Sequence, residues 1–220
     1  AGAGREMGGK YGKRHLPKYQ GFDEGRSLAS GRDSGLPPLT VRVSGLGFAS
    51  LIGEDAWFNE PAELAQRAGA EVLCVINASP FHLGKMNERE ERMAVRARAV
   101  AMPLLYAHLA GAQDEIVFDG ASFALDAHGV VGARAKMFDE DLAIVAVTRT
   151  SVRGTITAIP GGDAQPWAEL VMGMRDYSGM NACPGLITGR NCGHAPAPGL
   201  PLSSQPPGSL SRPMVDTRTP

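Results

Sequence analysis

The sequence has few cysteines, few aromatic residues and no excess of charge of either sign. Its 220 residues include three cysteines, Cys74, Cys183 and Cys192, and 6% aromatic residues. An odd number of cysteines without a C-x-x-C pair is typical of a protein from a reducing compartment. The net charge is −1, with acids and bases interspersed, so nothing indicates a nucleic-acid surface. These features favour a cytoplasmic protein that acts on a small neutral or anionic molecule.

Long apolar runs are also missing. No stretch approaches the roughly 20 apolar residues that span a bilayer, and the N-terminus lacks the apolar core of a signal peptide. We therefore predict no contact with a membrane. The five histidines are scattered and have no H-x-x-x-H spacing or cysteine partner, so we predict no metal site. The length allows one domain with a sizeable core and a tail.

What the sequence does contain is an alternation of strand and helix patterns. Strands are predicted at 39–43, 45–52 and 71–77, with a helix that begins at Asn59 and ends at Gly69. The remaining predicted elements are a helix at 87–102, strands at 104–109, 116–118, 122–125, 130–133 and 142–147, and a helix at 167–177. A β-α-β unit followed by antiparallel strands predicts a mixed sheet in an α/β layer.

The strand-to-helix turn at Gly53 lacks the nucleophilic side chain that such a turn is suited to present. Residues 48–58 read FASLIGEDAWF, so Gly53 follows an apolar strand and precedes a helix start. A strand-to-helix turn of this kind exposes a side chain beside backbone N–H groups, which suits an attacking thiol and its oxyanion. Glycine fits the turn but supplies no nucleophile. Glu54 and Asp55 have a simpler interpretation as first-turn acids that complement the helix dipole.

Four segments carry longer motifs. Residues 13–26 read KRHLPKYQGFDEGR, residues 52–61 read IGEDAWFNEP, residues 75–85 read VINASPFHLGK and residues 111–123 read GAQDEIVFDGASF. In this order and spacing they resemble the glutaminase part of glutamine-dependent NAD synthetases, over about residues 10–148. That family has a cysteine where this chain has Gly53.

The resemblance implies a fold and a set of site residues. The fold is α/β, the nitrilase-like (carbon-nitrogen hydrolase) α-β-β-α sandwich. We expect it to be incomplete at the N-terminus, because the family's general-base glutamate would lie upstream of Lys13. By the motifs, Lys13 matches the catalytic lysine, Glu24 a supporting glutamate and Gly53 the nucleophile position, whereas Tyr19 and Ser79 match positions that hold glutamine.

Plainer interpretations exist for several of these residues. Without its flanking motif Lys13 reads as a solvated surface lysine. Ser79 could belong to an ordinary strand-end turn, and Tyr19 could serve only for packing. Cys74 and Ser50 are poor substitute nucleophiles, because each lies inside a predicted apolar strand.

We predict three parts in the chain: a partial hydrolase (glutaminase) domain at 1–148, a linker with the start of a synthetase domain at 149–189, and a disordered Pro/Ser-rich tail at 190–220. Residues 167–177 resemble the L-V-x-G-L-R-D-Y segment that opens the family's synthetase domain. Its pyrophosphate-binding S-G-G-x-D-S motif does not follow Gly189. We therefore assign no cofactor to this chain, and ATP and Mg to the missing synthetase domain.

Three hypotheses for function remain open. The chain is the glutaminase portion of a glutamine-dependent NAD synthetase, which releases ammonia from glutamine for the ATP-dependent amidation of deamido-NAD and forms homo-oligomers in that family. Alternatively, it is a catalytically dead scaffold or interaction domain, or a fragment from a damaged reading frame. Gly53 predicts that the chain is inactive as it stands.

Overall fold

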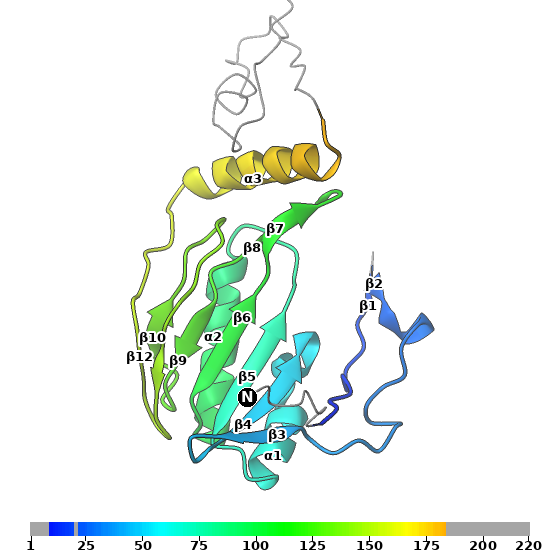
Figure 1. Cartoon of the computed structure of the whole chain (residues 1–220), viewed down its shortest axis with the longest axis vertical. Coiled ribbons are helices and arrows are strands. Elements are labelled where there is room, and N and C mark those ends of the chain that lie inside the picture. The colour runs from blue at the N-terminus through cyan, green and yellow to red at the C-terminus, as the bar shows by residue number, and fades with distance from the viewer. Residues whose placement is uncertain (1–8, 20–21, 184–220) are drawn as a thin grey trace, which may run out of the picture.

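Six strands form the central sheet of the protein, in the order β10-β9-β6-β5-β4-β3 (Figure 1). The computed structural model describes residues 9–19 and 22–183. The central strands β4, β5 and β6 are parallel, whereas β3, β9 and β10 run antiparallel to their neighbours. The strand bounds are Thr40–Val43 for β3, Leu46–Ile52 for β4, Val72–Asn77 for β5, Leu104–His108 for β6, Phe123–Leu125 for β9 and Val131–Arg134 for β10. The predicted mixed sheet is confirmed.

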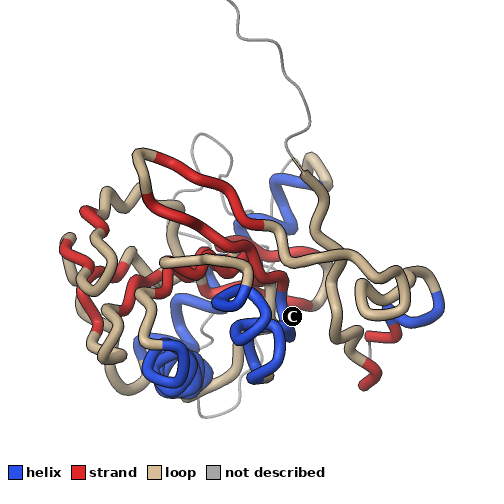
Figure 2. Tube along the Cα trace, turned by 90° about the horizontal axis from the view of Figure 1, so that it is seen from below, coloured by secondary structure: helices blue, strands red, loops and turns tan. Residues whose placement is uncertain are grey.

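Two helices connect the parallel strands and cover one face of the sheet (Figure 2). Helix α1 spans Asn59–Arg67 and links β4 to β5, and α2 spans Lys85–Val100 and links β5 to β6. Their apolar sides carry small and flexible residues, which let the helices approach the strands closely. The fully buried residues between the helices and the strands include Leu51, Ala62, Ala65, Leu73, Met93, Ala97 and Leu104.

The opposite face of the central strands is also apolar but remains accessible. Successive residues of a strand point to opposite faces, so Ile52 and Ile76 lie on the face away from α1 and α2. Ile76 is 60% exposed. Cys74 lies on this face too, in β5 as predicted, and is half-buried. Burial raises the pKa of its thiol, which makes it a poor nucleophile at neutral pH.

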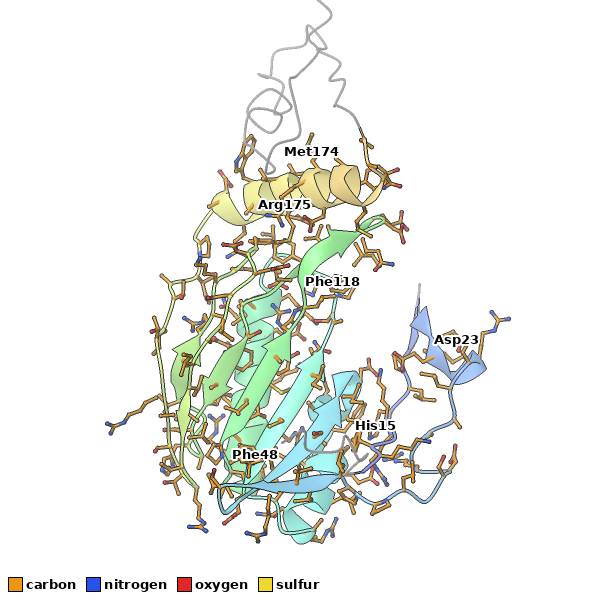
Figure 3. The ribbon with its side chains drawn as sticks, in the orientation of Figure 1. His15, Asp23, Phe48, Phe118, Met174 and Arg175 are labelled. Atoms are coloured by element: carbon orange, nitrogen blue, oxygen red, sulfur yellow. The ribbon has the colours of Figure 1, made fainter. Side chains whose placement is uncertain are left out.

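A hairpin and a third helix extend the fold beyond the carboxyl end of β6. Strands β7 (Ala110–Gln113) and β8 (Ile116–Asp119) form the hairpin, and α3 (Ala164–Met180) packs across it. The side chain of Asp176 accepts a hydrogen bond from the backbone N–H of Ala112 at 2.8 Å. Figure 3 shows Arg175 on the side of α3 that faces Phe118 of the hairpin.

The N-terminal arm, residues 9–38, lies beside the sheet and holds a small two-stranded hairpin. Its strands are β1 (Lys18–Tyr19) and β2 (Phe22–Asp23), and a short 3-10 helix, Glu24–Arg26, follows (Figure 1). The arm returns to the sheet where it meets a second 3-10 helix, Gly53–Trp57, directly after β4. This contact brings the arm to the predicted site.

The last part of the predicted strand pattern was wrong. In place of a strand over 142–147, the structure has β11 at Ala146–Val147, paired with β12 at Val152–Arg153. Leu142 and Ile144 are more than four-fifths exposed, at 86% and 83%, so these apolar residues have no layer to pack against. Helix α2 begins and ends two residues earlier than predicted, and α3 extends three residues beyond the predicted limits at each end, as is common for helix limits.

One prediction falls outside this structure. The predicted disordered tail at 190–220, with the end of the predicted segment 149–189, lies outside the described residues. The division into three parts remains a prediction.

Candidate functional site

The candidate site lies at the carboxyl edge of the three parallel strands. Gly53 follows β4, Asn77 ends β5 and His108 ends β6. Because parallel strands point the same way, their carboxyl ends meet at one edge, where α/β sheets commonly bind ligands. The fold thus places three distant parts of the sequence side by side.

Gly53 has a left-handed backbone conformation that a residue with a Cβ atom would adopt only with strain. Its φ angle is +55°, in the left-handed region that favours glycine. A Cβ atom at this position would lie 3.2 Å from Nζ of Lys13 and 3.8 Å from Oδ1 of Asn77. A side chain at position 53 would therefore point at the lysine predicted to act with it.

The Lys13 ammonium is held by a carboxylate from the same arm. Its Nζ donates to both carboxylate oxygens of Glu24, at 2.7 and 2.6 Å. Both side chains are largely covered, with 15% of the lysine and 27% of the glutamate exposed. Burial raises the pKa of Glu54, an effect that the nearby charge of Lys13 partly offsets. The structure thus brings Lys13, Glu24 and Gly53 together.

Asp55 does more than complement a helix dipole. It is fully buried, and its carboxylate accepts hydrogen bonds from the N-terminal arm on both sides of Lys13. Asp55 does lie in the first turn of the 3-10 helix Gly53–Trp57, and it binds the arm as well. Glu54, which is half-buried beside Lys13, contributes to the site rather than to the outer surface.

Ser79 reaches the site through a chain of hydrogen bonds. The Nδ2 of Asn77 donates to Oγ of Ser79 at 3.1 Å and to the hydroxyl of Tyr106 at 2.5 Å. The Oγ of Ser79 lies 3.2 Å from Nε2 of His108. Nδ1 of His108 lies 2.7 Å from the carbonyl oxygen of Leu109 and must donate to it. Nε2 is then the acceptor, and Ser79 donates to it.

The structure keeps His108 neutral. Burial, together with the positive charge of Arg89, lowers the pKa of His108 to about 4. Arg89 of α2 is itself fully buried in an ion pair with Asp119 of β8, whose charge acts in the opposite sense on His108. A neutral His108 is what the observed acceptor role of Nε2 requires.

We expect stability to fall as the pH drops from 6.5 towards 4. In this window the unfolded chain protonates His108, whose ordinary pKa is 6.5, while the folded chain does not. This difference in protonation lowers the free energy of unfolding by about 2 kcal/mol between pH 8 and pH 5. Urea unfolding at the two pH values measures it. His108→Asn should lose about 2 kcal/mol less than the wild type, whereas His128→Asn, which removes an exposed histidine, should match the wild type. Equal losses in all three proteins would contradict the assignment.

The structure does not test the role predicted for Tyr19 in holding glutamine. It lies in β1, six residues after Lys13, but its side chain is outside the part of the chain that the structure describes. Its contact with glutamine remains a prediction.

Sequence reasoning missed Asn77 and His108 as site residues. Both were visible as polar residues that end apolar runs, and adjacent parallel strands bring such ends together. Tyr11 was missed as well, because only the fold shows its hydroxyl 2.6 Å from Asp55.

Other kinds of site are not found in the described part of the chain. Over residues 9–19 and 22–183, no group of three or more His, Cys, Asp or Glu side chains is placed to hold a metal ion. Among the helices in these ranges, none has the length and apolar character needed to cross a membrane.

A largely covered lysine lies beside a strand-end turn on a mixed sheet. The carbon-nitrogen hydrolase family model matches residues 2–157, so the chain belongs to the carbon-nitrogen hydrolase family. The fold is nitrilase-like, as predicted. A carbon-nitrogen hydrolase from Helicobacter pylori has a TM-score of 0.52 and 25% identity, covering 58% of this chain and 48% of that one.

Within the family, the similar proteins are glutamine-dependent NAD(+) synthetases. The Xanthomonas campestris protein is 36% identical over 78% of this chain and 32% of its own length, and the Rhodobacter capsulatus protein 37% identical over 75% and 30%. The ADP complex of the Acinetobacter baumannii enzyme has a TM-score of 0.76 and 28% identity, covering 83% of this chain and 34% of that one. The chain thus spans about a third of the curated relatives' length.

Proposed function

We propose that the chain is the glutaminase portion of a glutamine-dependent NAD synthetase, with its nucleophile position occupied by Gly53. In the complete reaction this portion releases ammonia from the glutamine side-chain amide. The ammonia then amidates deamido-NAD at an ATP-dependent synthetase site. The observation that carries the proposal is the 3.2 Å between Nζ of Lys13 and the place of a Cβ at position 53.

The chemistry of amide hydrolysis explains the arrangement. A thiolate at the turn attacks the amide carbon, and the oxygen of the tetrahedral intermediate becomes negative. A fixed ammonium at this point stabilises that charge without reorganisation during the reaction. Glu24 keeps the Lys13 ammonium in place through two hydrogen bonds. The family's general-base glutamate takes the thiol proton and passes it to the nitrogen as the C–N bond breaks, so that ammonia leaves and a thioester remains. Water, activated by the same carboxylate, then cleaves the thioester to give glutamate and the free thiol.

We assign the holding of glutamine to Ser79 and Tyr19. The Oγ of Ser79 has Asn77 as donor and His108 as acceptor, which fixes its direction. In this proposal ATP and Mg belong to the synthetase part of the complete protein. The predicted homo-oligomer and the cytoplasmic location are part of the same proposal.

The test restores a thiol and asks whether glutamine protects it. In Gly53→Cys, iodoacetamide should alkylate position 53, as read by peptide mass. About 10 mM L-glutamine should slow this alkylation about tenfold, because it exceeds the usual range of KM values for enzymes. D-glutamine and L-asparagine should protect poorly, and Ser79→Ala should weaken protection by L-glutamine.

Gly53 favours a second candidate, a catalytically dead scaffold domain. Such a domain keeps the hydrolase fold but does not need to keep a pocket that binds glutamine. If the introduced thiol reacts readily and L-glutamine gives no protection, the scaffold candidate replaces the glutaminase assignment.

A further inference from the structure

Asp55 carries an unusually complete set of hydrogen bonds for a buried carboxylate. The backbone N–H of Arg14 lies 3.0 Å from both carboxylate oxygens, and the N–H of His15 donates to Oδ1 at 2.7 Å. The hydroxyl of Tyr11 donates to Oδ2 at 2.6 Å. Burying a carboxylate is costly unless such donors replace water. Asp55 thus binds one particular segment of the chain.

The donors flank Lys13 in the sequence. Two of them follow it directly, and Tyr11 precedes it by two residues. On the other side of the arm, the N–H of Gly31 donates to the carbonyl of Lys13 at 2.8 Å. The Oγ of Ser30 donates to the carbonyl of Arg14 at 2.7 Å. The backbone at Lys13 is therefore fixed to the turn that begins with Gly53.

We propose that Asp55 is a positioning residue, which holds the Lys13 ammonium beside position 53. Lysine has a long flexible stem, so fixing its backbone and its head separately is needed to place the charge. Asp55 fixes the backbone and Glu24 fixes the head. The proposal rests on the proposed function, because it takes position 53 and Lys13 as partners.

Removing the charge of Asp55 can change the pKa of a thiol at position 53 in two ways, by its direct electrostatic effect or by displacing Lys13. The two effects have opposite signs, so the direction of the pKa change distinguishes them. A side chain at position 53 would lie directly beside Lys13, and the charged groups that act on the adjacent Glu54 are Lys13, Glu24, Asp55 and Lys85. Lys85 of α2 lies near Glu54. Removing the negative charge of Asp55 acts directly to lower the pKa of that thiol. Losing the position of Lys13 raises the pKa instead, because a nearby ammonium favours the thiolate.

The experiment is a double-mutant cycle in the Gly53→Cys chain. The pH dependence of iodoacetamide alkylation at position 53 gives the apparent pKa of the introduced thiol. Lys13→Met should raise this pKa by about 1. Asp55→Asn should also raise this pKa. The variant that carries both changes should have a pKa no higher than that of the variant with Lys13→Met alone. Glu60→Gln, which removes a more exposed acid that also contacts the arm, should leave the pH profile unchanged.

The outcomes distinguish this inference from the proposed function. If Lys13→Met shifts the profile and Asp55→Asn leaves it unchanged or lowers the pKa, Asp55 is not a positioning residue. If Lys13→Met shifts nothing, the proposed site itself fails. Should Asp55→Asn not fold, Tyr11→Phe carries the test, since it removes one hydrogen bond and keeps the carboxylate. Tyr11→Phe should raise the pKa by a smaller amount, and no rise would overturn the inference.

Discussion

The purified chain is expected to release no ammonia from glutamine above the rate in buffer. A side chain at position 53 would point at the Lys13 ammonium, but the residue there is glycine, which carries no thiol. In enzymes whose catalytic residues act as a unit, loss of the nucleophile alone costs on the order of a millionfold in turnover. If the proposed glutaminase site is correct, its lysine can stabilise an oxyanion but no group attacks the amide, so we expect no useful hydrolysis.

Ammonia release can be followed by coupling it to glutamate dehydrogenase. Lys13→Met is the matched control, because it alters the same site and should give the same trace as the wild type. Glutamine-dependent ammonia production that Lys13→Met abolishes would show that another group serves as nucleophile. Ser50 and Cys74 lie in β4 and β5, where their own strands hold them away from the turn.

The central sheet could be predicted because its sequence shows the two-residue alternation of strands and the 3.6-residue pattern of helices, each in the segment where that element forms. Strand β4 alternates in burial and stops at a glycine, and helix α1 ends at Arg67, two residues before Gly69, whose φ is +86°. Local patterns of this kind agree with the final fold, so reading them required no tertiary information. The β7 strand escaped prediction because AGAQ is a run of small and polar residues.

The apolar residues 142–147 misled the prediction for a physical reason. A run such as LAIVAV indicates a buried strand only if another layer covers it. In this chain Leu142 and Ile144 face solvent, and only Ala146–Val147 pairs. Hydrophobicity alone does not say whether such a layer exists.

Part of the candidate site could be picked out from the sequence, and the roles of its residues remain predictions. Lys13, Glu24 and Gly53 are fixed by motifs that carry their own spacing, and the fold brings them together. The support by Asp55 and His108 depends on hydrogen bonds across about 30 to 40 residues of sequence. No local pattern reports such contacts, because they arise only when distant segments meet.

Restoring the thiol should produce an unusually reactive cysteine. In Gly53→Cys the new side chain lies beside the Lys13 ammonium, which favours the thiolate. Cys74 is the internal comparison, since burial raises the pKa of its thiol. At pH 7 we expect alkylation at position 53 to be at least about tenfold faster than at Cys74.

The substitution has a structural cost that can be measured alongside. A φ of +55° is unfavourable for cysteine by about 1 to 3 kcal/mol. The Lys13 side chain must also move by a few tenths of an ångström, since its Nζ and Cε lie 3.2 and 3.3 Å from the new Cβ. Gly53→Ser has the same backbone cost and no thiol, so it should share the lowered stability and show no new alkylation.

The most direct measurement is the alkylation rate at position 53 and at Cys74, by peptide mass at pH 7, in Gly53→Cys and in Gly53→Cys with Lys13→Met. We expect fast labelling at position 53, a several-fold slower rate after Lys13→Met, and an unchanged slow rate at Cys74. Equally slow labelling of both thiols, insensitive to Lys13→Met, would contradict the claim that Gly53 occupies a nucleophile position beside Lys13.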